Sequence, residues 1–182
     1  MKVVGFTIAR NIVQADYPLK EALLSVLPLC DEMVIAVGNS EDSTKAYLES
    51  MNNPKIRLFD TQWDDTKRVG GAVLADETNK ALSEVPHDAD WLIYIQADEC
   101  LHEQYLPVVR KAMEQYLNDT EVDGLLFDYL HFYGNYSMVG DSRRWYRQEI
   151  RIIKNNRNFR SWKDAQGFRT ADGKKLKVAK ID

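Results

Sequence analysis

The sequence predicts an α/β protein whose core is a mostly parallel sheet with helices on both faces. Four short runs of β-branched and aromatic residues alternate with segments of helical periodicity through residues 2–116. Such alternation is typical of parallel strands joined by right-handed helical crossovers, which place helices on both faces of the sheet. After Gly124, strand-like segments predominate. We therefore expect an α/β core followed by an added β-rich C-terminal segment.

Two strand and helix units make up the first half of the predicted core. The apolar run at 2–9 predicts a buried strand, and the apolar spacing at 19–27 predicts a helix with Pro18 in its first turn. The run at 33–37 predicts a second strand. The polar turn after it supplies an N-cap and first-turn acids for a helix that ends near Met51.

The second half of the core repeats this order. Residues 56–59 predict a third strand, and 70–82 predict a helix that follows a long polar connection. Residues 91–95 predict the fourth strand, and 105–116 predict a helix with one apolar face. The four strands thus each lead into a helix, as a parallel sheet requires.

The β-rich segment after the core contains strand-like runs at 125–133 and 145–153, separated by a polar stretch. A last alternating segment at 176–181 reaches Asp182 without a turn or a cap. No internal repeat or Pro/Gly linker divides the chain. We expect residues 1–182 to form a single domain that lacks a C-terminal segment.

The composition is that of a soluble globular protein, with 182 residues of which 45% are hydrophobic and 29% charged. The apolar runs fall short of the ~20 residues that a membrane-spanning helix needs, and the N-terminus lacks the pattern of a signal peptide. Cys30 and Cys100 lie in or beside apolar runs, which indicates reduced, buried thiols. We expect a cytoplasmic protein without a transmembrane segment. The three scattered histidines do not support a zinc site.

Charge is distributed unevenly along the chain. Residues 1–142 contain 11 Lys and Arg against 24 Asp and Glu, a net charge of −13, whereas residues 143–180 contain 13 against 3, a net charge of +10. A basic C-terminal segment of this kind indicates an anionic partner, such as a diphosphate, an anionic lipid surface or a nucleic acid. It is also explained as a solvated basic face that balances the acidic body.

The fourth predicted strand ends abruptly in two acidic residues, Asp98 and Glu99. Open α/β sheets bind ligands just outside the carboxyl ends of their strands. Carboxylates at that place suit Mg²⁺ or Mn²⁺, and such an ion would in turn hold a diphosphate. The same two acids are explained equally well as residues that favour the start of the following helix.

Three further loops carry polar side chains near expected strand ends. Residues 7–11 follow the first strand, 38–44 follow the second, and Arg68 lies in the charged loop 63–71. Side-chain oxygens, helix N-terminal amides and a guanidinium there can bind a base, a ribose or a phosphate. Each loop is also explained without a ligand, as a solvated loop, a helix cap or a surface ion pair. The motifs G-x-G-x-x-G and G-x-x-x-x-G-K-[ST] are absent, which argues against dinucleotide oxidoreductases and P-loop nucleotidases.

The order of these motifs resembles family 2 glycosyltransferases of GT-A fold, which belong to the nucleotide-diphospho-sugar transferase superfamily. The likeness covers roughly residues 2–115, with Arg-Asn after the first strand, Asn-Ser-Glu-Asp-Ser-Thr after the second, Trp-Asp-Asp after the third and Gln-Ala-Asp-Glu after the fourth. Two departures stand out. Val37 and Gly38 occupy positions where the family has acidic residues, one of which reads the nucleotide base, and Gln96 replaces the first aspartate of the family's Asp-x-Asp.

The resemblance implies a GT-A-like (Rossmann-like) fold and transfer of a sugar, with inversion, from a nucleoside diphosphate donor to a carbohydrate or lipid-linked acceptor. It implies Mn²⁺ or Mg²⁺ held by Asp98 with Glu99, and because Gln96 adds no charge the ion would be optional. It implies a base that takes the acceptor proton, for which Asp164 is the first candidate and Asp141 the second. Asp164 is equally explained as a structural ion pair. The donor-binding residues implied are Thr7, Ala9, Asn11, Asn39, Ser40, Asp42, Arg68, Gln96, Ala97 and Asp98.

Two other functions stay open. A non-catalytic GT-A-like domain could bind an anionic polymer or surface through the basic C-terminal segment, where residues 143–147 interleave arginines with aromatic residues. This segment is also our candidate for peripheral membrane contact, and nucleic acid is the less favoured partner. A nucleotidyltransferase on a similar sheet is less favoured than either, because the Gly-rich loop expected after its first strand is missing.

Overall fold

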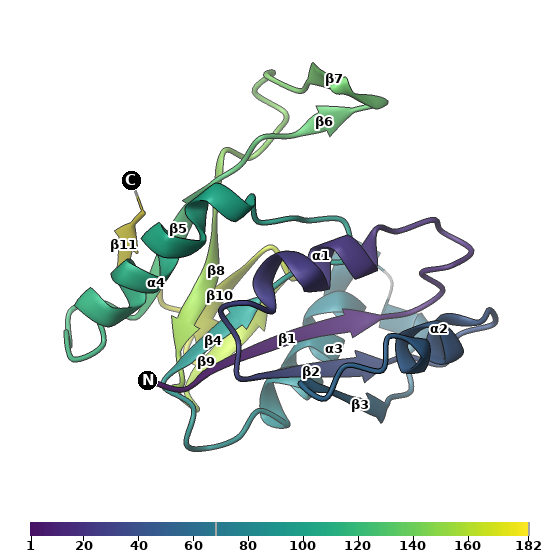
Figure 1. Cartoon of the computed structure of the whole chain (residues 1–182), viewed down its shortest axis with the longest axis horizontal. Helices are drawn as coiled ribbons and strands as arrows, with labels where there is room; N and C mark the ends of the chain where they lie inside the picture. The colour runs from purple at the N-terminus through teal and green to yellow at the C-terminus, as the bar shows by residue number, and fades with distance from the viewer. Residues whose placement is uncertain (68, 182) are drawn as a thin grey trace.

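The computed structural model describes residues 1–67 and 69–181, and within them a seven-stranded sheet forms the centre of the protein (Figure 1). The strand order is β11-β5-β8-β4-β1-β2-β3. The seven strands are β1 (Val3–Ala9), β2 (Glu32–Val37), β3 (Ile56–Asp60), β4 (Trp91–Tyr94), β5 (Gly124–Asp128), β8 (Gln148–Lys154) and β11 (Val178–Lys180).

Most neighbouring strands of this sheet are parallel, as the sequence predicts. β1 pairs in parallel with both β2 and β4, β2 pairs in parallel with β3, and β11 pairs in parallel with β5. β8 is inserted between β4 and β5 and is antiparallel to both. The parallel strands β1 to β4 therefore end at one edge of the sheet, and β8 runs back toward the opposite edge.

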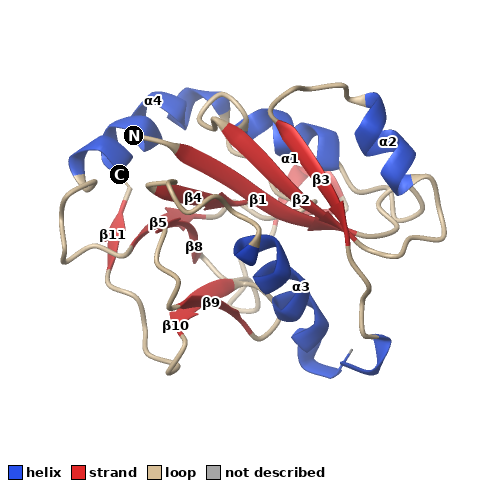
Figure 2. Ribbon diagram, turned by 90° about the horizontal axis from the view of Figure 1, so that it is seen from below, coloured by secondary structure: helices blue, strands red, loops and turns tan. Residues whose placement is uncertain are grey.

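Helices cover both faces of the sheet, which confirms the predicted α/β architecture (Figure 2). On one face lie α1, α2 and α4, whose buried side chains pack against Met33 and Ile35 of β2. On the other face lie α3 and the β9–β10 hairpin, which pack against Phe6 and Val34. The bounds are α1 (Leu19–Val26), α2 (Thr44–Ser50), α3 (Ala72–Ser83), α4 (Leu106–Gln115), β9 (Phe159–Trp162) and β10 (Gly167–Thr170), with short 3₁₀ turns at Asp65–Lys67, Val69–Gly71 and Glu103–Tyr105.

Burial on both faces explains why the first strands are almost continuously apolar. Successive side chains of a strand point to opposite faces of the sheet. Met33 and Ile35 therefore join the core under α1, whereas Val34 and Ala36 join the core under α3. A strand that is covered on both faces has no solvent-facing positions. Its sequence is therefore a continuous run of apolar residues rather than an alternation of apolar and polar residues.

The β-rich segment differs from its sequence-based prediction. The strand expected at 125–133 is divided into β5 and the short strand β6 (Phe132–Tyr133). The strand expected at 145–153 begins only at Gln148, and the polar stretch before it contains β7 (Asn135–Val139). β6 and β7 form an antiparallel hairpin that projects from the body (Figure 1). All of their residues are exposed, so no buried face marks them in the sequence.

The last alternating segment is a strand, as expected, because β11 pairs with β5 at the edge of the sheet. In the part of the chain that the structure describes, no helix has the length and apolarity to cross a membrane. Cys30 and Cys100 are both free thiols. Cys30 is buried as expected, whereas Cys100, which we also expected to be buried, is exposed, because it follows the end of the buried strand β4.

The two thiols differ in burial, and we expect them to differ in reactivity. Cys30 is 2% exposed, and burial raises the pKa of its thiol to about 12. Cys100 is exposed. Because the thiolate is the reactive form, iodoacetamide at pH 8.5 should alkylate Cys100 in the folded protein and Cys30 only after unfolding in urea. Intact mass spectrometry before and after unfolding tests this, and equal rates at both thiols in the folded protein would contradict the described burial.

Candidate functional site

A cavity of about 560 Å³ opens beyond the carboxyl ends of β1 and β4. Its walls come from the residues that follow β1, the loop after β3, the start of α3, the exit of β4 and the turn between β9 and β10. Parallel strands bring their carboxyl ends to one edge of the sheet, and this edge is where open α/β sheets bind ligands. Of the predicted site residues, the structure places Asn11, Gln96, Ala97, Asp98 and Asp164 together in this cavity.

The exit of β4 holds two neighbouring acids in different environments. Asp98 lines the cavity at its exposed rim. Desolvation by the surrounding protein, with a smaller contribution from the negative charge of Glu99, raises the pKa of Asp98, while Arg151 and His131 act in the opposite direction. The Gln96 side chain donates a hydrogen bond to the carbonyl oxygen of Ala165 at 3.2 Å, which ties this loop to the β9–β10 turn.

Glu99 turns away from the cavity into a buried ion pair with Arg151 of β8. The Arg151 Nη2 to Glu99 Oε1 distance is 2.6 Å and the Nε to Oε2 distance is 2.9 Å, and the two side chains are only 5% and 9% exposed. Tyr129 donates a further hydrogen bond to Glu99 Oε1 at 3.0 Å. Both oxygens of Glu99 are thus bonded to protein groups, and Glu99 lies outside the lining of the cavity.

Arg151 connects three parts of the site. Its guanidinium carbon lies 5.5 Å from the ring centroid of Tyr94 and 5.2 Å from that of Tyr129, so the charge sits between two aromatic faces. It also donates to the carbonyl oxygen of Gln166 in the β9–β10 turn. The exit of β4, the end of β5 and the β9–β10 turn are therefore fixed to one side chain that the sequence analysis did not single out.

The β9–β10 turn brings Asp164 into the cavity from the α3 side. Gly71 precedes α3 with φ = +71°, and a Cβ atom at this position would lie 2.6 Å from Cβ of Asp164. The close approach thus needs a residue without a side chain, which also tolerates the left-handed backbone. Asp141, the second candidate base, is 86% exposed, pairs with Arg147 at 3.4 Å and lines a different cavity. The structure separates the two candidates.

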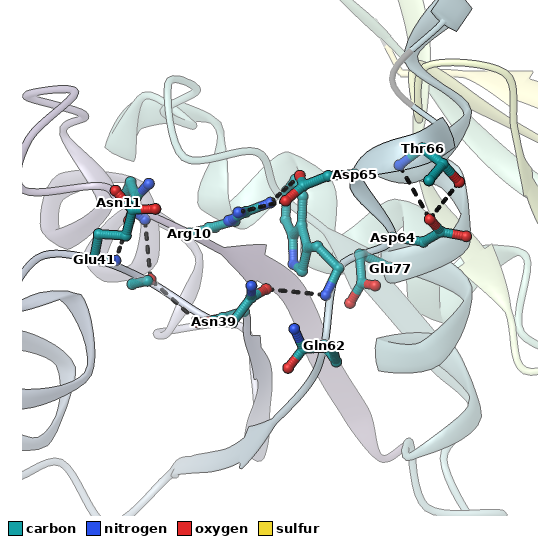
Figure 3. A network of polar contacts seen from close by, with 12 residues as sticks. Arg10, Asn11, Asn39, Glu41, Gln62, Asp64, Asp65, Thr66 and Glu77 are labelled. Atoms are coloured by element: carbon teal, nitrogen blue, oxygen red, sulfur yellow. Dashed lines mark hydrogen bonds and ion pairs between the residues drawn. The ribbon is translucent and has the colours of Figure 1, made fainter.

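Arg10, Trp63 and Asp65 form a corner of the cavity that the sequence analysis assigned only in part. Figure 3 shows Arg10 bonded to Asp65. Arg10 donates to both oxygens of Asp65, at 2.7 and 3.1 Å, and its guanidinium lies 5.3 Å from the Trp63 ring centroid. Among the described residues, Arg10 Nε and Trp63 Nε1 are buried without a hydrogen-bond partner.

The position of Trp63 explains the missing acid after β2. A Cβ atom on Gly38 would lie 2.3 Å from Trp63 Nε1, so the indole occupies the space that a side chain at 38 would need. The Trp63 backbone N–H also donates to Asn39 Oδ1 at 3.0 Å, which holds the loop after β3 against the end of β2. An acidic residue at position 38 and this tryptophan exclude each other sterically.

Several residues expected to bind the donor have structural partners instead. Thr7 is buried and donates to the Ile95 carbonyl oxygen at 2.5 Å, and Ala9 lies in the core. Ser40 accepts from the Asn11 backbone N–H at 3.1 Å. Asp42 accepts from the Thr44 N–H at 2.9 Å, which forms an Asx turn just before α2. Thr7, Ala9, Asn39, Ser40 and Asp42 stay outside the cavity lining, and Arg68 lies outside the described residues.

No protein-family model matches the sequence, and no curated protein matches it in sequence. The fold is similar to those of solved structures. One is residues 1–349 of S. aureus TarS in complex with UDP, with 21% identity and a TM-score of 0.52 over 74% of this chain and 37% of that fragment. Another is a 4-diphosphocytidyl-2C-methyl-D-erythritol synthase, with 17% identity and a TM-score of 0.53 over 85% of this chain and 75% of the synthase. The chain has a GT-A-like fold.

This likeness confirms the fold implied by the sequence motifs, and at these identities it shows the fold alone. The chain spans 37% of the TarS fragment 1–349 and 23% of the longer TarS structure. The synthase has a similar fold, and its name gives a different activity. Membership of family 2 stays a prediction. The activity must be argued from the cavity itself.

We expect the ion pair between Arg151 and Glu99 to dominate the stability of this site. Replacing Arg151 by Met leaves a buried carboxylate unpaired, which costs about 3–5 kcal/mol in the free energy of unfolding. The double variant Arg151→Met with Glu99→Leu should recover much of this loss, because no charge is left buried. Urea unfolding followed by circular dichroism measures both.

Lys45→Met is the matched control, because it removes a cation whose partner Asp60 is exposed. Its unfolding midpoint should stay close to that of the wild type. Equal midpoints for Arg151→Met and Lys45→Met would show that the buried pair does not hold the site together.

Proposed function

We propose that the chain is the donor-binding domain of a glycosyltransferase that uses a nucleoside diphosphate sugar. The observation that carries this proposal is the cavity at the carboxyl ends of β1 and β4, into which Asp98 projects in a GT-A fold. The similar TarS structure holds UDP, which supports a uridine nucleotide as the first donor to test. A cavity of about 560 Å³ is within the usual range of small-ligand sites.

Asp98 can bind a divalent cation as the single protein carboxylate of a site completed by the substrate. Mg²⁺ is commonly bound by one or two carboxylates together with phosphate oxygens of the substrate and water, rather than by an all-protein cage. Among the described residues there is no cluster of three or more His, Cys, Asp or Glu that could form such a cage. We therefore assign Asp98 alone to Mn²⁺ or Mg²⁺ with the donor diphosphate. When bound, the ion would offset the negative charge of the departing diphosphate.

The other residues of the cavity have distinct roles in this proposal. Arg10 and Trp63 form the wall against which the nucleoside packs. Asn11 and Gln96 line the path between this corner and Asp98. Asp164 accepts the proton of the acceptor hydroxyl during in-line attack at the sugar, which gives inversion.

The alternative of a non-catalytic domain with a basic binding face is not favoured by the positions of the basic residues. Arg151 is buried, and several lysines of the segment pair with acidic residues of the body, such as Lys177 with Glu121 and Lys180 with Asp128. Part of the charge asymmetry along the sequence thus joins the C-terminal segment to the body, whereas Arg143 and Arg144 are exposed. Peripheral membrane contact through this segment stays a prediction.

A nucleotidyltransferase is the second candidate function, because the synthase fold covers more of this chain than TarS does. The two activities differ in what they bind. A nucleotidyltransferase takes a nucleoside triphosphate, whereas a glycosyltransferase holds a nucleoside diphosphate and its sugar. Comparing CTP and UTP with UDP and GDP under identical conditions therefore separates them.

The donor site predicts metal-dependent binding of a nucleoside diphosphate. At a concentration 100 times Kd, a ligand that binds only the folded state adds about 2.7 kcal/mol to its stability. We expect UDP with Mn²⁺ to raise the Tm, and Asp98→Asn to abolish the part of the shift that needs Mn²⁺. Glu114→Gln removes the same charge from an exposed position on α4 and should behave as the wild type. A shift with CTP and none with UDP or GDP would replace our proposal by the second candidate.

The assignment of Asp164 as the base predicts that its loss lowers turnover but not donor binding. Asp164→Asn should keep the UDP affinity of the wild type while lowering hydrolysis of UDP-glucose, UDP-galactose or UDP-N-acetylglucosamine about 100-fold or more, because water also needs a base. Release of UDP in a coupled assay measures this, with Glu114→Gln as control. Wild-type hydrolysis by Asp164→Asn together with a loss in Asp141→Asn would assign the base to Asp141 instead.

A further inference from the structure

A second cavity, of about 270 Å³, lies at the base of the β6–β7 hairpin. One wall is formed by residues 128–131, which leave β5, and the other by residues 139–147, which lead from β7 toward β8. Figure 1 shows this hairpin projecting from the body, so the cavity lies where the projection joins the sheet. None of the donor-site assignments above uses this cavity.

Four aromatic rings, those of Tyr129, His131, Trp145 and Tyr146, line this cavity and pack on one another. The His131 and Trp145 centroids are 5.0 Å apart with an interplanar angle of 33°, and the His131 and Tyr146 rings meet edge to face at 4.5 Å. His131 Nε2 lies 2.6 Å from the Tyr146 carbonyl oxygen, which fixes the imidazole. These contacts hold the rings in place before any ligand binds, and a rigid aromatic wall needs little ordering on binding.

The rim of the cavity is polar and exposed. Asp141 and Arg147 form an ion pair at 3.4 Å with side chains that are 86% and 76% exposed, and Ser142 lies beside them. An aromatic wall with hydrogen-bonding groups along its edge matches a pyranose ring, which has an apolar C–H face and hydroxyl groups at its periphery. A phosphate would meet only one cation of this lining, Arg147, and that cation already has an acidic partner.

The two cavities adjoin at one side chain. Tyr146 lines both of them, and Asp98 and Asp164 line the donor cavity. A ring that stacks in the second cavity would therefore lie beside the donor cavity. An acceptor must lie next to the donor for in-line attack.

We propose that the aromatic cavity between the exit of β5 and the residues after β7 binds the acceptor, and that the acceptor group bound there is a neutral saccharide ring. The assignment of this cavity to the acceptor rests on the proposed function, because only a transferase has an acceptor. Trp145 supplies the stacking face, and the pair of Asp141 and Arg147 bonds the hydroxyl groups at the rim.

The test uses methyl glycosides of glucose, galactose and N-acetylglucosamine as probes, with saturation-transfer NMR on the whole chain in the presence of saturating UDP and Mn²⁺. At least one glycoside should bind the wild type, and Trp145→Ala should weaken its binding at least tenfold. Trp145→Phe keeps an aromatic face and should retain most of it. Tyr136→Ala removes an aromatic ring that is 83% exposed on the hairpin and lines neither cavity, and it should bind as the wild type.

The UDP affinity of each variant serves as the control for correct folding. Asp141→Asn changes an exposed side chain at the rim, and it should weaken glycoside binding without disturbing the packing of the aromatic rings. If UDP binds and no glycoside does, the proposal of a saccharide site in this cavity is wrong, and the proposed donor site is unaffected. The same conclusion follows if Trp145→Ala and Asp141→Asn both bind the glycoside as the wild type does. If glycosides bind through Trp145 while no nucleotide binds, the proposed function fails and with it the acceptor role.

Discussion

The ion pair between Arg151 and Glu99 is the interaction on which the geometry of the site depends. Two charges that are nearly removed from water are stable only when each is fully bonded, and here Glu99 receives bonds from Arg151 and Tyr129 while Arg151 lies between two aromatic rings. Because Glu99 directly follows Asp98, fixing one fixes the other. A metal or diphosphate ligand needs a carboxylate held in place by its surroundings, and the buried pair provides this without occupying the cavity.

A second constraint acts at the other end of the cavity. The Trp63 indole fills the space beside Gly38 and carries Arg10 on its face. Arg10 in turn donates to both oxygens of Asp65, so its guanidinium is fixed by an aromatic ring and a carboxylate together. The two ends of the cavity thus differ, with a carboxylate at Asp98 and a fixed guanidinium at Arg10.

The parallel core was predictable because burial on both faces leaves a local signal, a continuous apolar run between polar turns. The exit of β4 could be recognised as a site for the same reason, since polar residues interrupt such a run abruptly. The sequence could not distinguish Asp98 from Glu99, because the difference lies in Arg151, a partner 52 residues away. β7, β9 and β10 were missed, because β7 is exposed throughout and has no buried face, and because β9 and β10 have four residues each, too few for a periodic pattern to stand out.

The insertion of β8 between β4 and β5 has a consequence for the order in which the protein assembles. β1, β2, β3 and β4 are formed by the first half of the chain and can pair while the remainder is still being synthesised. The edge of β4, however, waits for a partner that begins at Gln148, and contacts of such sequence separation form late because the intervening chain must first be closed into a loop. The first four strands of the sheet therefore form before the cavity is complete. The cavity is completed only after the C-terminal quarter is synthesised, because Arg151 and Asp164 come from that part of the chain.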